Sequence, residues 1–210
     1  MKCGYTPMNT VGEFKTELRT ALKRGNSLDA LLGSYMRRAS QWIEQNYTLQ
    51  YMRRRFDLRL EAGTDSIPMP RRCKTVEVIK WTGVPLDYVT CSKRTFDMID
   101  RVPDATVIPQ QFYLDGQSEI VFNGRASGLL TGVGMAVLYS DFPADDRDSH
   151  WLIVNAEELF LLQCVIASSV LNRDERTWQM TKIQRDELIK VMLNADYEAV
   201  YTGMDLVQQA

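Results

Sequence analysis

The sequence predicts an α+β protein: a helical bundle (N-terminal helices plus a C-terminal αα-hairpin) with an inserted small antiparallel β-sheet domain. Apolar residues follow a helical period at both ends of the chain and alternate with polar residues in short runs between them. The 210 residues are 45% hydrophobic, which is enough for a sizeable core. The expected parts are N-terminal helices in 1–50, the inserted β domain in 51–145, the helical hairpin in 146–202, which packs on the N-terminal helices, and a tail in 203–210.

The N-terminal part is expected to form two amphipathic helices. The first spans residues 10–24, with Asn9 or Thr10 as its cap. The second follows a Gly-Asn stop, and Arg37 and Arg38 lie on its polar side. Its apolar face consists of Leu28, Leu31, Leu32, Tyr35, Ala39, Trp42 and Ile43.

A sheet is expected in the middle of the chain. Phe56, Leu58 and Leu60 alternate with charged residues, which is the period of a half-buried strand. Asp115-Gly116 is a hairpin signal, because both residues tolerate the backbone angles of a two-residue turn. Residues 92–101 are expected to form a short helix. Further strands are expected at 76–81, 86–89, 112–114, 119–122 and 135–139.

The C-terminal part is expected to form an αα-hairpin. Asn155 can cap a helix whose apolar residues cover nearly the whole circumference, so we expect this helix to be buried on most sides. Asp174 can cap a long final helix, which Gly203 would end. The apolar positions of the final helix are Trp178, Ile183, Leu188, Val191, Met192, Ala195 and Ala199.

Composition argues against membrane, secreted and metal-binding classes. The charge-free stretch from Leu159 to Asn172 is shorter than the roughly 20 apolar residues of a membrane span. The first residues lack the apolar core of a signal peptide, so the expected compartment is the cytoplasm. No CxxC pair occurs, so we expect reduced, packed thiols rather than a zinc or redox site at the four cysteines, Cys3, Cys73, Cys91 and Cys164.

No enzyme activity, cofactor or metal ion is expected. His150 lies in a polar loop, where a surface or loop-anchoring role is expected, and Cys164 lies in an apolar helix, where a thiol stays protonated. The glycines at 128, 132 and 134 lack the Lys-Ser/Thr of a phosphate loop and are expected in a bulge or turn before a strand. The acidic run at 145–148 lacks the spacing of a calcium loop and is expected to be solvated.

Charge is distributed unevenly along the chain. Residues 1–140 contain 19 Lys/Arg and 14 Asp/Glu, a net charge of +5, whereas residues 141–210 contain 6 and 13, a net charge of −7. Such polarity can steer a nucleic acid, join copies of the chain, or leave two solvated faces without a partner. The alternative function that it raises is a soluble DNA-binding accessory protein, which would contact the duplex backbone through Arg37, Arg38, Arg53, Arg54 and Arg55.

Several short phrases follow one another in a characteristic order. A strand and turn end in Pro at residues 60–70, and a Gly-x-Pro-Leu phrase follows at 83–86. The hairpin at 112–122 has an aromatic-x-x-x-Gly pattern, and the strand at 138–143 ends in an aromatic-Pro pair. In this order, over roughly residues 27–200, the chain resembles the head-to-tail adaptor (connector) proteins of tailed bacteriophages.

The resemblance implies a structural virion protein that is not an enzyme. It implies a homododecamer ring at the head–tail joint, which docks on the portal protein, connects it to a tail or nozzle protein and forms part of the DNA channel used in ejection. Genomic DNA would pass without sequence-specific binding, and a net charge of −2 suits such a conduit better than a strongly basic chain. Before assembly the protein would lie in the host cytoplasm.

The resemblance also implies two contact regions, because family members dock through exposed extensions. The final helix and tail would face the portal, and two loops would face the next tail component. The portal-side residues would be Tyr197, Tyr201, Met204, Leu206 and Val207, and the tail-side residues Asp115, Gly116, Asp145 and Asp146.

Overall fold

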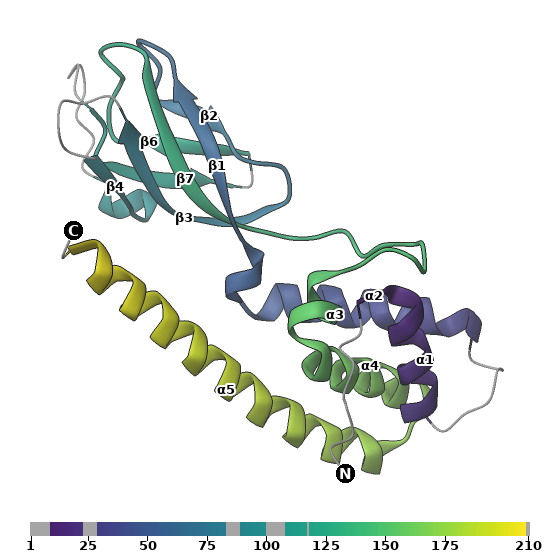
Figure 1. Ribbon diagram of the computed structural model, residues 1–210. Coiled ribbons are helices and arrows are strands. Elements are labelled where there is room, and N and C mark those ends of the chain that lie inside the picture. Colours follow the sequence, from purple (N-terminus) through teal and green to yellow (C-terminus); the bar gives the residue numbers. More distant parts are fainter. Residues whose placement is uncertain (1–8, 23–28, 83–88, 100–107, 117, 209–210) are drawn as a thin grey trace. The chain divides into compact units, whose positions relative to one another are not determined.

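The computed structural model describes residues 9–22, 29–82, 89–99, 108–116 and 118–208 (Figure 1). Its backbone contacts divide the chain into two compact units. The helical unit comprises residues 1–51 and 141–210, and the sheet unit comprises residues 52–140. About 46% of the residues are helical and 26% lie in strands, so the sheet is too large to be a minor insertion in a helical bundle.

The sheet unit corrects the expected fold class. Its seven described strands form one mixed, nearly closed, barrel-like sheet in the order β1-β7-β3-β4-β5-β6-β2, rather than a small antiparallel sheet. Strands β4 and β5 run parallel, an arrangement that the long connection at 94–110 permits. The strands are β1 (Arg53–Leu60), β2 (Ser66–Pro68), β3 (Cys73–Thr82), β4 (Val89–Lys93), β5 (Gln111–Asp115), β6 (Glu119–Phe122) and β7 (Leu130–Leu138).

The end strands of the sheet nearly meet. β1 and β2 contact each other, and a groove lined by residues 56–59 and 67–70 marks the seam between them. The short strand β2 was not expected, because its three residues include Pro68 and carry too little alternation to be recognised. It pairs with β6 through Ser66–Val121, Ile67–Ile120 and Pro68–Glu119.

Other boundaries in the sheet unit also differ from expectation. The helix expected at 92–101 is wrong, because β4 continues to Lys93 and only a 3₁₀ turn, Phe96–Met98, follows in the described residues. Most of the strand expected at 86–89 lies outside the described residues. The strands expected at 112–114 and 119–122 are confirmed by β5 and β6.

Two glycines of β7 make room for neighbouring strands. Gly132 and Gly134 lie inside the strand, so the expectation of a bulge or turn before it is wrong for both. Gly134 pairs with Phe56 of β1, and a Cβ at position 134 would lie 2.3 Å from Cε1 of the Phe56 ring. The ring therefore covers the glycine across the strands, a contact that joins β1 to β7.

The helical unit is built around one apolar helix. Helix α4 packs against α1, α2, α3 and α5, and Figure 1 shows it between α1 and α5. This position follows from its composition, because apolar side chains cover most of its circumference. The helices are α1 (Val11–Ala21), α2 (Asp29–Asn46), α3 (Trp151–Asn155), α4 (Glu157–Asn172) and α5 (Glu175–Gln208).

Local sequence signals correctly predict the N-terminal caps of α1 and α5. Thr10 and Glu13 form a capping box on α1, and backbone hydrogen bonds from Asn9 and Thr10 lower the pKa of Glu13. The Asp174 carboxylate accepts a hydrogen bond from the Thr177 N–H at 3.1 Å and so caps the start of α5, as expected.

Two expected helix boundaries are wrong. Asn155 does not cap the buried helix, since it is the last residue of the short helix α3, and Ala156 separates α3 from α4. Gly203 does not end the final helix, because α5 continues to Gln208. Within the described residues, no helix is both long and apolar enough to cross a lipid bilayer.

Candidate interaction surfaces

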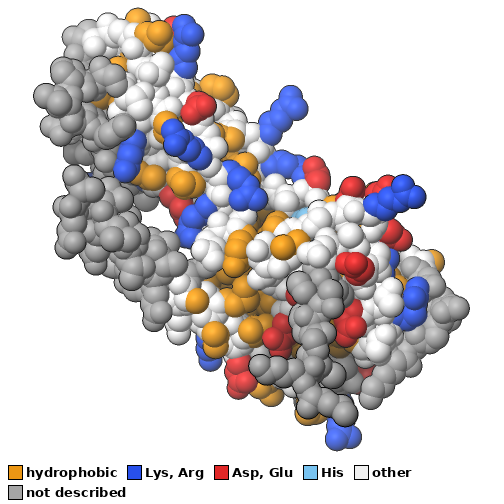
Figure 2. Space-filling model, in the orientation of Figure 1, with side chains coloured by type: hydrophobic (Ala, Val, Ile, Leu, Met, Phe, Trp, Pro, Cys, Tyr) orange, Lys and Arg blue, Asp and Glu red, His pale blue; other side chains and the backbone are white. Residues whose placement is uncertain are grey.

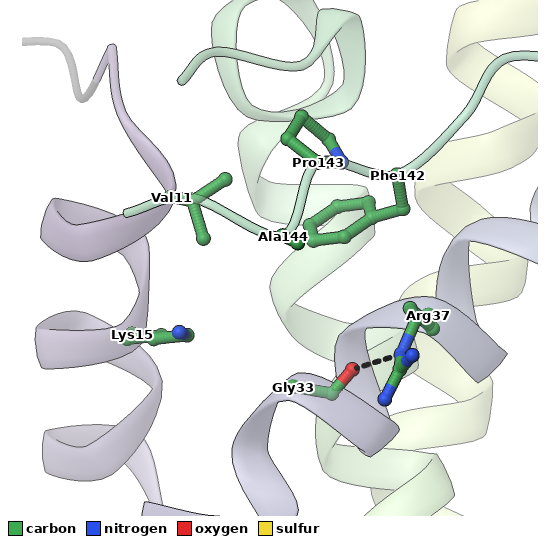
Figure 3. Close-up of a pocket in the computed structure, with 7 residues that line it drawn as sticks. All are labelled: Val11, Lys15, Gly33, Arg37, Phe142, Pro143 and Ala144. Carbon is green, nitrogen blue, oxygen red and sulfur yellow. Dashed lines mark hydrogen bonds between the residues drawn. The ribbon is translucent and has the colours of Figure 1, made fainter. Parts of the chain in front are cut away.

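A pocket of about 160 Å³ opens on the helical unit where three segments distant in sequence meet. Figure 3 shows the loop residues Phe142, Pro143 and Ala144 along one side, with two cationic side chains, one from α1 and one from α2, across from them. The lining residues are Val11, Lys15, Gly33, Arg37, Phe142, Pro143 and Ala144. An apolar wall beside two cations suits an acidic side chain flanked by apolar ones.

The two cations of the pocket are held in place by their neighbours. Nε of Arg37 donates to the Gly33 carbonyl oxygen at 3.3 Å (Figure 3). Lys15 forms an ion pair with Asp146. Lys15 is therefore neutralised by its own chain, and Arg37 is the cation of the pocket that a further carboxylate can reach.

The acidic loop before α3 is tied to the start of α1. The Val11 and Gly12 N–H groups donate to the carbonyl oxygens of Asp148 and Asp146, each at 2.9 Å. The Asp145 carboxylate accepts from the Arg147 N–H at 2.9 Å. Asp145 and Asp146, which the resemblance assigns to the tail side, are thus exposed residues that also order this loop.

Helix α5 carries an exposed apolar face. Met180, Ile183 and Val191 have 59%, 60% and 65% of their surface exposed, although the sequence assigned Ile183 and Val191 to the apolar side of this helix. Figure 2 shows hydrophobic side chains among charged ones along this helix. Exposed apolar residues that recur on one helix face are typical of a surface that binds another protein.

The opposite face of α5 is fastened by Arg185. This side chain is buried, its Nη1 donates to Gln163 Oε1 at 2.9 Å, and its Cζ lies 4.3 Å from the centre of the Trp42 ring. Arg185 therefore joins α5 to α4 and α2 through a hydrogen bond and a cation–π contact. The exposed face of α5 is fixed in orientation as a result.

The arginines of the DNA-binding alternative do not form one patch in either unit. Arg37 and Arg38 are exposed on α2 of the helical unit, whereas Arg53, Arg54 and Arg55 begin β1 of the sheet unit. Arg53 donates to Glu77 at 2.9 Å, and Arg54 lies on the opposite face of the strand from its two neighbours. The run of three is therefore divided between two faces and partly neutralised.

The other residues that the resemblance assigns to contacts lie at the β5–β6 hairpin and in α5. The hairpin is present and Gly116 has a φ of +59°, but Asp115 ends β5 and pairs with Glu119, so the expected two-residue turn at Asp115-Gly116 is wrong. The side chains assigned to the portal side lie outside the described residues, although the backbone of α5 passes through all five positions, namely Tyr197, Tyr201, Met204, Leu206 and Val207.

The histidine and the described cysteines, which are the side chains most often used in catalysis, are buried in the fold. His150 is buried, its Nδ1 accepts from the Leu152 N–H at 3.3 Å at the start of α3, and burial lowers its pKa to about 4. His150 therefore anchors a loop, which is one of the two roles that the sequence predicts, but it does so from a buried position rather than from the surface. Cys73, Cys91 and Cys164 are free and buried, and burial raises the pKa of Cys91 to about 12. Among the described residues, no cluster of His, Cys, Asp or Glu could hold a metal ion.

Sequence reasoning missed the pocket and the exposed face of α5. Lys15 carried no local signal, and Phe142 was noted only as part of an aromatic-Pro pair, because their place in one pocket depends on three segments meeting. The exposed positions of α5 could have been found by placing its residues around the helix at 100° each, since Met180 and Val191 fall on one side and Leu188 and Met192 on the other.

The chain was compared with protein-family models and with curated proteins. The model described as SU10 adaptor protein matches residues 9–189, which span both units. The comparison with curated proteins finds no match.

Proposed function

The chain belongs to the SU10 adaptor protein family, whose members are phage adaptors. On this premise we propose that it is a ring-forming head-to-tail adaptor and not an enzyme. It docks on the portal, joins it to a tail or nozzle protein, and surrounds part of the channel through which DNA leaves the head. The observation that carries the proposal is the family match over residues 9–189.

Two features of the helical unit support self-assembly into a ring. A closed ring needs two different surfaces on each subunit, one for each neighbour. The cationic pocket between α1 and α2 and the exposed face of α5 are two such surfaces, and α4 packs against all three helices that carry them. Their chemistry differs, as a head-to-tail contact requires.

The charge of the chain supports a channel rather than a DNA clamp. The net charge is −2, and the runs of arginine are divided between units and between strand faces. A ring of such subunits would not hold duplex phosphates, which are spaced one charge per about 1.7 Å, as firmly as a basic ring. DNA would slide through it.

The portal contact is proposed to lie at the C-terminal end of α5, with the tail contact at the Asp115–Gly116 hairpin and the loop at 141–149. The test is to mix purified protein with purified portal and measure particle mass and negative-stain images. We expect annular stacks of adaptor on portal, with twelve copies in each ring.

A variant that stops after residue 202 is the matched comparison. We expect it to keep the thermal unfolding midpoint of the full chain and to lose attachment to the portal. Full-length protein that leaves the portal bare would contradict the proposed function. A truncated protein that still attaches would contradict only the placement of the portal contact.

A further inference from the structure

The exposed face of α5 combines apolar residues with one acidic residue. At 100° per residue, Met180, Glu187 and Val191 fall within about 40° of one another around the helix, with Ile183 beside them. Among the described residues, no hydrogen bond or ion pair engages the Glu187 carboxylate. This face, defined by Met180, Ile183, Glu187 and Val191, thus offers one unpaired negative charge between exposed apolar side chains.

The pocket between α1 and α2 has the complementary composition. Phe142 and Pro143 provide an apolar wall and Arg37 provides positive charge (Figure 3), whereas Lys15 is already paired with Asp146. Arg37 uses its Nε for the Gly33 carbonyl, and no described residue accepts from its two terminal nitrogens. The pocket can therefore accept one carboxylate in a forked hydrogen bond, with apolar groups around it.

The two surfaces cannot meet within one chain. Helix α4 packs against α1, α2 and α5, and Figure 1 shows it between α1 and α5. Arg185 fastens the inner face of α5 to Gln163 and Trp42, so the outer face stays turned away from the unit. Complementary surfaces on different sides of one subunit are what a heterologous, closing contact needs.

We propose that the Glu187 face of one copy binds the Arg37 pocket of the next copy. The Glu187 carboxylate accepts hydrogen bonds from the Arg37 guanidinium, and Ile183 and Val191 pack on Phe142 and Pro143. This contact rests on the proposed function, since it names the surfaces through which the ring closes. The partner is a second copy of this chain, because the chain carries both the acidic Glu187 face and the Arg37 pocket.

Charge reversal with rescue tests the contact. Glu187→Arg and Arg37→Glu are made singly and together, and ring assembly on the portal is followed by mass measurement across protein concentration. We expect each single variant to raise the concentration of half-assembly at least about tenfold, and the double variant to return it to within about threefold of the original.

Two matched controls reverse exposed charges outside the proposed contact. Glu17→Arg changes an exposed acid of α1, and Arg38→Glu changes the exposed neighbour of Arg37 on α2. Both are expected to assemble like the unmodified chain. Thermal unfolding of every variant shows that folding is intact, and the milder pair Glu187→Gln and Arg37→Gln serves if a reversal fails to fold.

The other outcomes overturn either the proposed contact or the proposed function. If the single charge-reversal variants assemble normally, the proposed contact does not form. If Arg37→Glu weakens assembly and adding Glu187→Arg does not restore it, the pocket binds an acidic segment of the portal instead. Self-association of the free protein at high concentration is measured in the same series. Rescue there without portal attachment would keep the contact and contradict the proposed function, whereas no association in either assay would contradict both.

Discussion

Trp81 lies directly opposite Gly132 in the ladder that joins β3 to β7, and the indole occupies the space that a side chain at position 132 would need. A Cβ there would lie 2.7 Å from the Lys80 carbonyl oxygen and 3.0 Å from Cε3 of Trp81. The indole Nε1 in turn donates to the Pro109 carbonyl oxygen at 2.9 Å. The close approach of β3 and β7 thus places Trp81 in the core of the sheet unit.

Gly132→Ala is therefore expected to destabilise the protein. The added methyl meets a backbone carbonyl, which cannot move away without shifting β3, so the free energy of unfolding should fall by roughly 1–3 kcal/mol. Gly128→Ala is the matched control, because no atom lies within 4 Å of a Cβ at that position. Chemical denaturation followed by Trp fluorescence measures both, and equal stability of the two variants would contradict the close contact.

The buried pair of Arg185 and Gln163 makes a second prediction. Gln163→Met leaves a buried guanidinium N–H without its acceptor, so we expect a loss of roughly 1–3 kcal/mol in the free energy of unfolding. Gln184→Met, at an exposed position of α5, should change stability by less than about 0.5 kcal/mol. If Gln163→Met behaved like this control, the hydrogen bond would not be what fastens α5.

His150 predicts a loss of stability in acid. Burial lowers its pKa in the folded protein to about 4, below the ordinary value of 6.5, so between these pH values the unfolded chain binds more protons than the folded one. Stability should therefore fall as pH drops from 6.5 toward 4, by up to about 1.4 kcal/mol per pH unit from this one group.

His150→Asn separates this effect from other acid effects. Asn keeps an acceptor for the Leu152 N–H but does not titrate. Urea unfolding at pH 7, 6 and 5 should show a flatter pH dependence for this variant than for the unmodified chain. Parallel pH profiles would show that His150 is not kept neutral by the fold.

The DNA-binding alternative predicts salt-dependent affinity that the adaptor proposal does not. We expect weak binding of the free protein to a duplex fragment at low salt, and none that survives about 150 mM salt. Fluorescence anisotropy across a salt series measures this. Tight binding that falls steeply with salt, and that Arg54→Ala or Arg55→Ala weakens, would favour the alternative.

Local sequence signals predicted the parts of the fold that local chemistry decides. Helical periodicity located α1, α2, α4 and α5, alternation located β1, and the Asp115-Gly116 pair located the hairpin between β5 and β6 but not its exact turn. These features depend on residues a few positions apart. The sequence did not predict the short strand β2 or the true start of α4, because neither carries a strong local signal.

By itself the sequence determined the long helices, the strands β1, β5 and β6, and the presence of a buried helix near the C-terminal end. Only the tertiary structure decided that the sheet is mixed and nearly closed, because a parallel pair such as Ser92 and Gln111 forms between segments that no short-range pattern connects. It also decided the interaction surfaces. Lys15, Arg37 and Phe142 line one pocket because packing around α4 brings three distant segments together, and Ile183 is exposed because Arg185 fixes which face of α5 turns inward.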